Sequence, residues 1–103
     1  MIARIWRGVV RTVDADTYGE YIRETGLTGY VATDGNRGAW LLRRALGGRT
    51  EFVTFTLWAS LDAVKGFAGE DFEKAVYYPE DERFLIERDE RCAHYEVEDW
   101  PLA

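Results

Sequence analysis

One stretch of this chain, from Glu51 to Phe72, constrains its fold more than any other. Residues 51–58 alternate between two uncharged sets, Phe52, Thr54, Thr56 and Trp58 on one side and Val53, Phe55 and Leu57 on the other. A period of two predicts a β-strand, and two uncharged faces predict a sheet that is covered on both sides. Ser60 then caps an amphipathic helix, which Gly69 interrupts. A strand that runs directly into a helix predicts an α+β fold.

The residues before this stretch predict two strands and a helix. The predicted elements are a strand over Ile2–Val10, a helix over Ala15–Thr25 that Asp14 caps and Gly26 ends, a loop over Leu27–Gly38, and a strand over Ala39–Ala45 that turns at Gly47-Gly48. Paired glycines supply the backbone angles of a tight hairpin. The second and third strands are therefore expected to pair.

The residues after this stretch predict one more strand. The predicted elements are a short helix from Asp71, a rigid turn over Tyr77–Asp81, local packing over Phe84–Ile86, a last strand over Arg91–Val97 and a tail over 98–103. The order is β-α-β-β-α-β, which is the ferredoxin-like plan with a four-stranded antiparallel sheet. We expect one domain over residues 1–103.

The second face of the sheet predicts a partner. Helices packed on one side cannot also cover the other, yet that face is apolar as well. A second copy of the chain is the economical cover, because a two-fold axis pairs one patch with itself. The sequence therefore predicts a homodimer.

Charge and composition exclude several classes of function. The formal net charge of −6 repels phosphate backbones, which argues against nucleic acid as a partner. No apolar run approaches the ~20 residues that cross a bilayer, so no membrane partner is expected. Cys92 and His94 are each the only residue of their type, which excludes an internal disulfide and a structural zinc site. We expect a cytoplasmic protein without a metal or cofactor.

Three segments resemble the antibiotic biosynthesis monooxygenase-like branch of the dimeric α+β barrel superfamily. They are Arg4-Ile5-Trp6 in the first strand, Gly35-Asn36-Arg37-Gly38 before the second, and Thr56-Leu57-Trp58-Ala59-Ser60 at the end of the third. The resemblance implies a dimeric α+β barrel with a pocket between sheet and helices in each protomer. It also implies oxidation of polycyclic phenols or quinols by molecular oxygen without a cofactor.

Other members of that family cleave haem. They use an Asn on strand one, a Trp at the end of strand three and a His on the second helical segment. Trp58 matches the Trp, but the strand-one position falls on Arg7 and the helical position falls near Val76 or Tyr77. Two of the three residues are therefore replaced in this chain.

Aromatic side chains are candidates for the walls of a pocket. Trp58 and Trp6 could hold an aromatic substrate between their flat faces, and Tyr78 could gate the mouth of the pocket or donate a hydrogen bond to a ligand. Each of the three also has a purely structural interpretation, as a packed residue of the core or of the helix ends. Glu80-Asp81-Glu82 is interpreted as a solvated acidic turn.

Three polar residues are candidates for catalysis. His94 titrates near neutral pH and could remove a proton from a phenol or quinol, or it could be a hydrogen-bonded strand histidine. Arg4 and Asn36 could stabilise the resulting anion. Arg7 is a further candidate, but strand alternation sets Arg4 beside Trp6 and opposite Arg7, so only one arginine can reach the pocket, and Arg4 is preferred. The alternative is a salt bridge with a carboxylate at the dimer interface.

The leading hypothesis is a cofactor-independent monooxygenase-like protein acting on an aromatic quinol or anthrone. The alternative is a non-catalytic dimer that binds a small apolar molecule or stabilises a partner. A third hypothesis is haem binding through His94. A cavity large enough for two fused rings would favour the first hypothesis. A space filled by side chains would argue against an enzyme.

Overall fold

The protein is described here from a computed structural model, in which residues 1–99 are described. Most of these residues fall in regular elements. The strands are β1 (Ile2–Arg11), β2 (Asn36–Leu46), β3 (Arg49–Trp58), β4 (Leu85–Arg88) and β5 (Ala93–Glu96), and the helices are the 3-10 helix η1 (Thr12–Asp14), α1 (Ala15–Ile22), the π-helix η2 (Arg23–Leu27), α2 (Thr28–Ala32), α3 (Leu61–Ala68) and α4 (Asp81–Phe84). The predicted tail begins within this part, but its residues 100–103 lie outside it.

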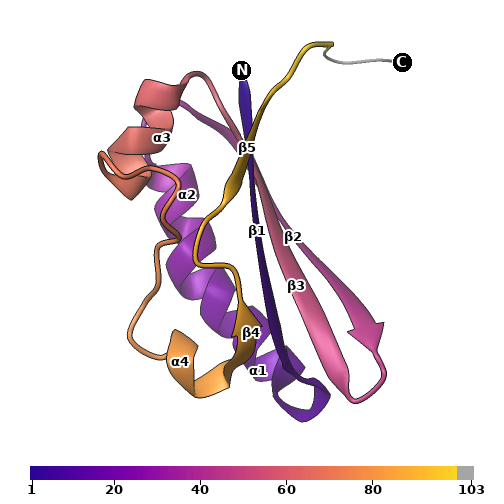
Figure 1. The fold of residues 1–103 in the computed structure, drawn as a ribbon. Coiled ribbons are helices and arrows are strands. Elements are labelled where there is room, and N and C mark those ends of the chain that lie inside the picture. Colours follow the sequence, from indigo (N-terminus) through magenta and orange to yellow (C-terminus); the bar gives the residue numbers. More distant parts are fainter. Residues whose placement is uncertain (100–103) are drawn as a thin grey trace.

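The strands form one antiparallel sheet in the order β2-β3-β1-β4, with β5 also paired to β1. β1 and β3 pair along their whole length, from Ile2 opposite Trp58 to Arg11 opposite Arg49. The Gly47-Gly48 hairpin joins β2 to β3 as predicted. Figure 1 shows the helices gathered on one side of this sheet. The α+β, ferredoxin-like fold is confirmed.

The edge strand beside β1 is split into two pieces. β5 pairs with Ile2–Ile5 and β4 pairs with Gly8–Val10, so the sheet is four strands wide but contains five. The prediction of local packing over Phe84–Ile86 was wrong, because Leu85 begins β4. The last strand is also shorter than predicted, since Arg91 forms only an isolated bridge with Lys74.

The first helical region is longer than predicted. It runs through α1, η2 and α2 to Ala32, so the expected end at Gly26 and the loop over Leu27–Gly38 were wrong. Gly26 has no positive φ, so nothing in its backbone ends a helix. The π-helical turn adds one residue to the helical hydrogen-bond pattern there, and the chain remains helical into α2.

The second helix begins where the sequence predicted. Ser60 caps α3, and its side chain accepts a hydrogen bond from the Ala63 amide at 3.2 Å. The helix ends at Gly69, whose φ is 87°. The short helix expected from Asp71 is absent from the described structure, where residues 70–80 form turns and one bridge.

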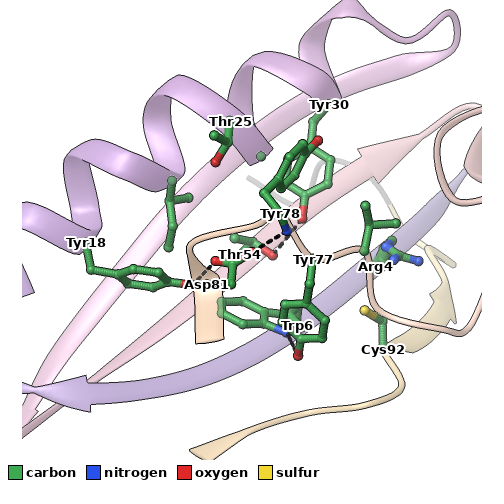
Figure 2. A pocket seen from close by; sticks show the side chains of 13 residues that line it. Arg4, Trp6, Tyr18, Thr25, Tyr30, Thr54, Tyr77, Tyr78, Asp81 and Cys92 are labelled. Carbon is green, nitrogen blue, oxygen red and sulfur yellow. Dashed lines mark hydrogen bonds between the residues drawn. The ribbon is translucent and has the colours of Figure 1, made fainter. Parts of the chain in front are cut away.

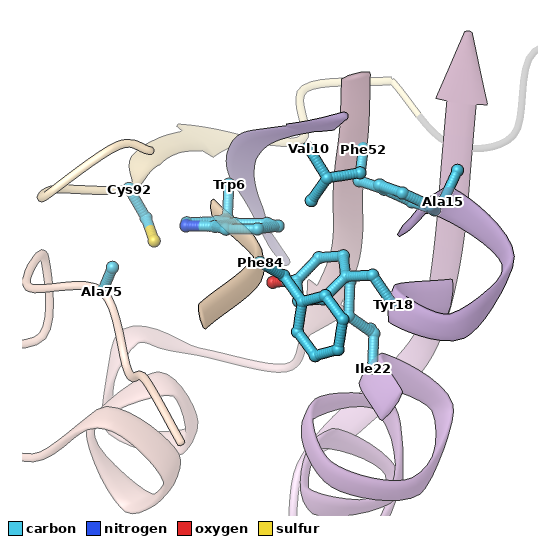
Figure 3. Packing of buried hydrophobic residues seen from close by; sticks show 9 residues of the cluster. All are labelled: Trp6, Val10, Ala15, Tyr18, Ile22, Phe52, Ala75, Phe84 and Cys92. Atoms are coloured by element: carbon cyan, nitrogen blue, oxygen red, sulfur yellow. The ribbon is translucent and has the colours of Figure 1, made fainter. Parts of the chain in front are cut away.

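Two apolar clusters fill the space between sheet and helices. The larger is built around Trp6, Tyr18, Phe52 and Phe84 (Figure 3). The smaller joins Tyr30, Trp58 and Val64. The site described next lies between them, since members of both clusters line it.

Candidate functional site

A small cavity lies between the sheet and the helical layer (Figure 2). Its lining comes from β1, β3, the α1–η2–α2 region, residues 76–81 up to the start of α4, and Cys92 just before β5. The volume open to the centres of water molecules is about 30 Å³. Because one water needs about 10–15 Å³ on this measure, the cavity has room for about two waters. Side chains fill most of the layer, and two fused rings do not fit without movement.

Arg4 is the only arginine among the lining residues, and its side chain is only 2% exposed. Strand alternation sets it on the helix side of β1, as predicted. Nη1 donates to the Phe72 carbonyl at 2.7 Å, and Nη2 donates to the Lys74 carbonyl at 3.4 Å. Nε has no partner within residues 1–99. The guanidinium is therefore held by main-chain carbonyls and keeps unused donors.

The neighbours of Arg4 do not balance its charge. His94 Nε2 lies 3.2 Å from Nη1, and burial together with Arg4 lowers the pKa of His94, so the imidazole accepts as a neutral group. Burial raises the pKa of the Cys92 thiol despite Arg4 nearby, so this side chain stays neutral too. No carboxylate of residues 1–99 forms an ion pair with Arg4. A buried cation without a counterion is costly for a fold to keep.

Asp81 carries the opposite charge in the same cavity. Its side chain is 5% exposed, and it accepts hydrogen bonds from the Tyr18 hydroxyl at 2.8 Å and from the Tyr78 amide at 2.6 Å. Burial and Asp81 together raise the pKa of Tyr18, which keeps the phenol protonated as a donor. The interpretation of residues 80–82 as a solvated acidic turn was wrong for Asp81. A cation and a carboxylate thus face one small cavity.

Aromatic rings form the walls between these two charges. The Trp6 indole donates to the Tyr77 hydroxyl at 2.8 Å, and the two rings meet edge to face. Burial raises the pKa of Tyr77 to about 12. The hydroxyls of Tyr30 and Thr54 lie 3.4 Å apart at another wall. The lining is therefore largely aromatic between the two charges, with hydroxyl groups in its walls.

The π-helical turn contributes to the site. Thr25 and Gly26 of η2 line the cavity. π-turns within helices are frequent at functional sites, because the extra residue changes the direction of nearby side chains. Opposite them, the Tyr78 hydroxyl lies against α2, so closely that a Cβ at Gly29 would sit 2.9 Å from it.

The structure brings three of the six predicted site residues to the cavity. Arg4, Trp6 and Tyr78 line it. His94 does not line the cavity, but it contacts Arg4 and packs edge to face on Phe72. The catalytic and ligand-binding roles expected for these residues stay predictions.

Trp58 and Asn36 lie elsewhere. Trp58 is 0% exposed in the smaller cluster, and its indole donates to the Thr56 hydroxyl at 2.8 Å. Asn36 accepts from the Gly38 amide at 3.0 Å at the irregular start of β2. Neither side chain is among those lining the cavity.

Sequence reasoning missed ten of the thirteen lining residues as site residues, among them Tyr18, Tyr30, Tyr77 and Asp81. Tyr18 carried a signal, since helical spacing turns it towards the core. Asp81 carried no signal in the sequence, because the residue that binds it, Tyr18, lies 63 residues away.

No helix in residues 1–99 has the length and apolar character needed to cross a membrane. The same part of the chain contains no group of three or more His, Cys, Asp and Glu side chains suited to a metal ion.

Comparison with known proteins gives a fold relationship. No protein-family model matches the sequence, and no curated protein matches it. A solved structure from Bacillus cereus, named as a candidate antibiotic biosynthesis monooxygenase, superposes with a TM-score of 0.67. The alignment covers 99% of this chain and 97% of the other, at 18% identity. The chain therefore has the fold of that protein.

Proposed function

We propose that this protein is a cofactor-independent monooxygenase-like protein that oxidises an aromatic quinol or anthrone with molecular oxygen. One observation carries the proposal: Arg4 is buried in an aromatic-walled cavity and pairs with no carboxylate of residues 1–99. A bound phenolate or enolate would supply the missing negative charge. The structural likeness to a candidate monooxygenase supports the same chemistry.

The cation makes the first step easier. A positive charge within about 4–6 Å lowers the pKa of an acidic group by about 1–3 units, so a bound phenol or enol loses its proton more readily. The resulting anion is electron-rich enough to pass an electron to oxygen. For an anthrone, the two C–H bonds of the methylene are replaced by C=O. One atom of O₂ becomes that carbonyl oxygen, and the other leaves as water with the two hydrogens.

His94 positions Arg4 in this proposal. Its neutral Nε2 accepts from Nη1, while the Phe72 carbonyl holds the same nitrogen from another side. The base role that the sequence suggested is less well supported, since the ring contacts Arg4 and does not line the cavity. Haem binding through His94 has the same difficulty.

The ligand enters past Tyr78 in this proposal. The cavity of about 30 Å³ must widen before a ring can enter it. Tyr77 and Tyr78 lie in residues 70–80, which have no helix or strand of their own. A segment outside the helices and strands moves more easily than the sheet.

Oxygen uptake with a panel of hydroquinones and anthrones tests the proposal. We expect Arg4→Met to lower kcat/KM at least about 100-fold, the effect of losing one preorganised donor to a developing anion. Arg11→Met is the matched control, since Arg11 is exposed at the far end of β1 and its ion pair within the described residues is with Asp14. Equal activity of the two variants would contradict the proposal, provided that circular dichroism shows both folded.

A second function has support in the small size of the cavity. A non-catalytic protein that binds a small molecule needs no room for oxygen beside its ligand. Ligand binding without oxygen consumption across the panel would favour this function. Oxygen consumption that depends on Arg4 would exclude it.

We also propose that the open face of the sheet binds a second copy of this chain. Trp40 and Leu42 are 45% and 50% exposed there, and Trp40 packs on Phe55 of the neighbouring strand. Glu51 lies on the same face and pairs with Arg7 and Arg44. A two-fold axis would bury the apolar strip against itself and leave such ion pairs at its margin.

A further inference from the structure

We infer that the cavity between Arg4 and Asp81 selects a single-ring aromatic molecule with an anionic oxygen at one end and a neutral hydroxyl at the opposite end. A hydroquinone monoanion and a para-hydroxylated aromatic carboxylate share this chemistry. The inference names the substrate class of the proposed function and uses the same cavity.

The Arg4 end provides donors for an anion. A guanidinium has five N–H groups, and residues 1–99 engage three of them, at the Phe72 carbonyl, the Lys74 carbonyl and His94 Nε2. The unused ones are on Nε and Nη2, which share one edge of the guanidinium. That edge is the one with which arginine binds two oxygens of an anion side by side.

The Asp81 end provides an acceptor for a hydroxyl. A carboxylate has about four acceptor positions, and the Tyr18 hydroxyl and the Tyr78 amide fill two of them. Both donors are neutral and already stabilise the charge of the carboxylate. A third neutral donor completes this arrangement, whereas an ammonium group would have to be stripped of its water in a buried place.

The two ends are separated by aromatic walls. Figure 2 shows Arg4 and Asp81 on opposite sides of the site, with Tyr77 and Tyr78 between them. Trp6 forms the floor on the sheet side. Once it has widened, a narrow space with a flat aromatic wall and one charge at each end suits one ring substituted at opposite positions. Fused rings require the cavity to widen further than a single ring does.

Binding of redox-inert probes tests the inference without depending on oxygen chemistry. The probes are 4-hydroxybenzoate, 4-methoxybenzoate and 4-(aminomethyl)benzoate, measured by isothermal titration with the full chain. A hydrogen bond to a charged group corresponds to about 10- to 100-fold in affinity, so we expect the hydroxy probe to bind tighter than the methoxy probe by that factor. Equal affinities, or tightest binding of the ammonium probe, would overturn the inference.

Variants assign the two ends. Arg4→Met should abolish binding of all three probes, because each carries the carboxylate. Asp81→Asn should remove the preference for the hydroxy probe over the methoxy probe. Tyr18→Phe removes a donor to Asp81 and keeps the carboxylate, so this variant should retain or increase the preference for the hydroxy probe. It tests the same assignment if Asp81→Asn does not fold. Loss of the preference in Tyr18→Phe would contradict the assignment of Asp81.

The outcome is separable from that of the proposed function. Selective binding of the hydroxy probe without oxygen uptake by hydroquinones would leave the ligand class standing and remove the oxygenase. Oxygen uptake by anthrones, together with equal binding of the hydroxy and methoxy probes, would support the oxygenase and overturn the inferred ligand class.

Discussion

Arg4 and His94 depend on each other at the scale of single residues. Arg4 needs an acceptor at Nη1, and His94 can be one only while its imidazole is neutral. Burial and the nearby guanidinium both lower the pKa of His94, so the folded chain keeps the ring neutral at a pH where an unfolded chain would protonate it. The pair therefore links the geometry of the cavity to pH.

This linkage predicts a loss of stability in mild acid. The unfolded pKa of His94 is near 6.5 and the folded pKa is lower, so the contribution is fully present above 6.5 and is lost as the pH falls through the folded value. We expect the free energy of unfolding, measured in urea at about pH 7.5 and about pH 5.5, to fall more for the natural chain than for His94→Gln. Parallel decreases in the two proteins would show that His94 is not responsible.

The long helical region shows how neighbouring elements override a local signal. Gly26 is a helix-ending residue by its type, yet it lies in η2, and the chain remains helical to Ala32. Tyr18, Ile22 and Tyr30 are all buried along this region. Their burial stabilises the continued helix by more than the ~1 kcal/mol that a mid-helix glycine costs.

Two glycine substitutions test this account of the elements. Gly26 has a helical neighbourhood, and an added Cβ would meet only Ile22 and Tyr30 at 3.9 Å, so Gly26→Ala should raise the free energy of unfolding by about 0.5–1 kcal/mol. Gly69 is the matched control, because it has open space but a φ of 87°. Gly69→Ala should lower stability by about 1–2 kcal/mol in the same urea titration. Destabilisation by Gly26→Ala would mean that the helix ends there.

The whole molecule has two unequal sides. The helices cover one face of the sheet, and the other face carries exposed apolar residues on β2. An exposed apolar strip of this kind is a common mark of a protein interface. The proposed dimer would cover it without changing the cavity, which lies on the helical side.

A charge on the open face should separate the proposed dimer. Trp40→Glu puts a carboxylate opposite its own symmetry mate, so we expect the dissociation constant to rise about 30-fold or more. Val31→Glu is the control, since Val31 is 63% exposed on α2, on the other side of the sheet. Sedimentation velocity measures both. A natural chain that sediments as a monomer at high concentration would refute the dimer.

Local signals were enough for much of the fold. The alternation over residues 51–58, the Gly47-Gly48 hairpin and the Ser60 cap each depend on residues a few positions apart, and the structure has all three. The strand period also set Arg4 and Trp6 on one face, and both line the cavity. β4 was missed because it forms by pairing with Gly8–Val10, more than 70 residues earlier, and its own four residues show no pattern.

The sequence by itself determined which residue types alternate, where the turns and caps lie, and therefore the order of the elements. Only the tertiary structure decided which charges are buried. Asp81 becomes a buried carboxylate because Tyr18 reaches it from another element. Arg4 has no carboxylate partner within residues 1–99, because the polar groups that contact it there are carbonyls and a neutral imidazole. Periodicity depends on bonded neighbours, whereas the desolvation of a charge depends on everything packed around it.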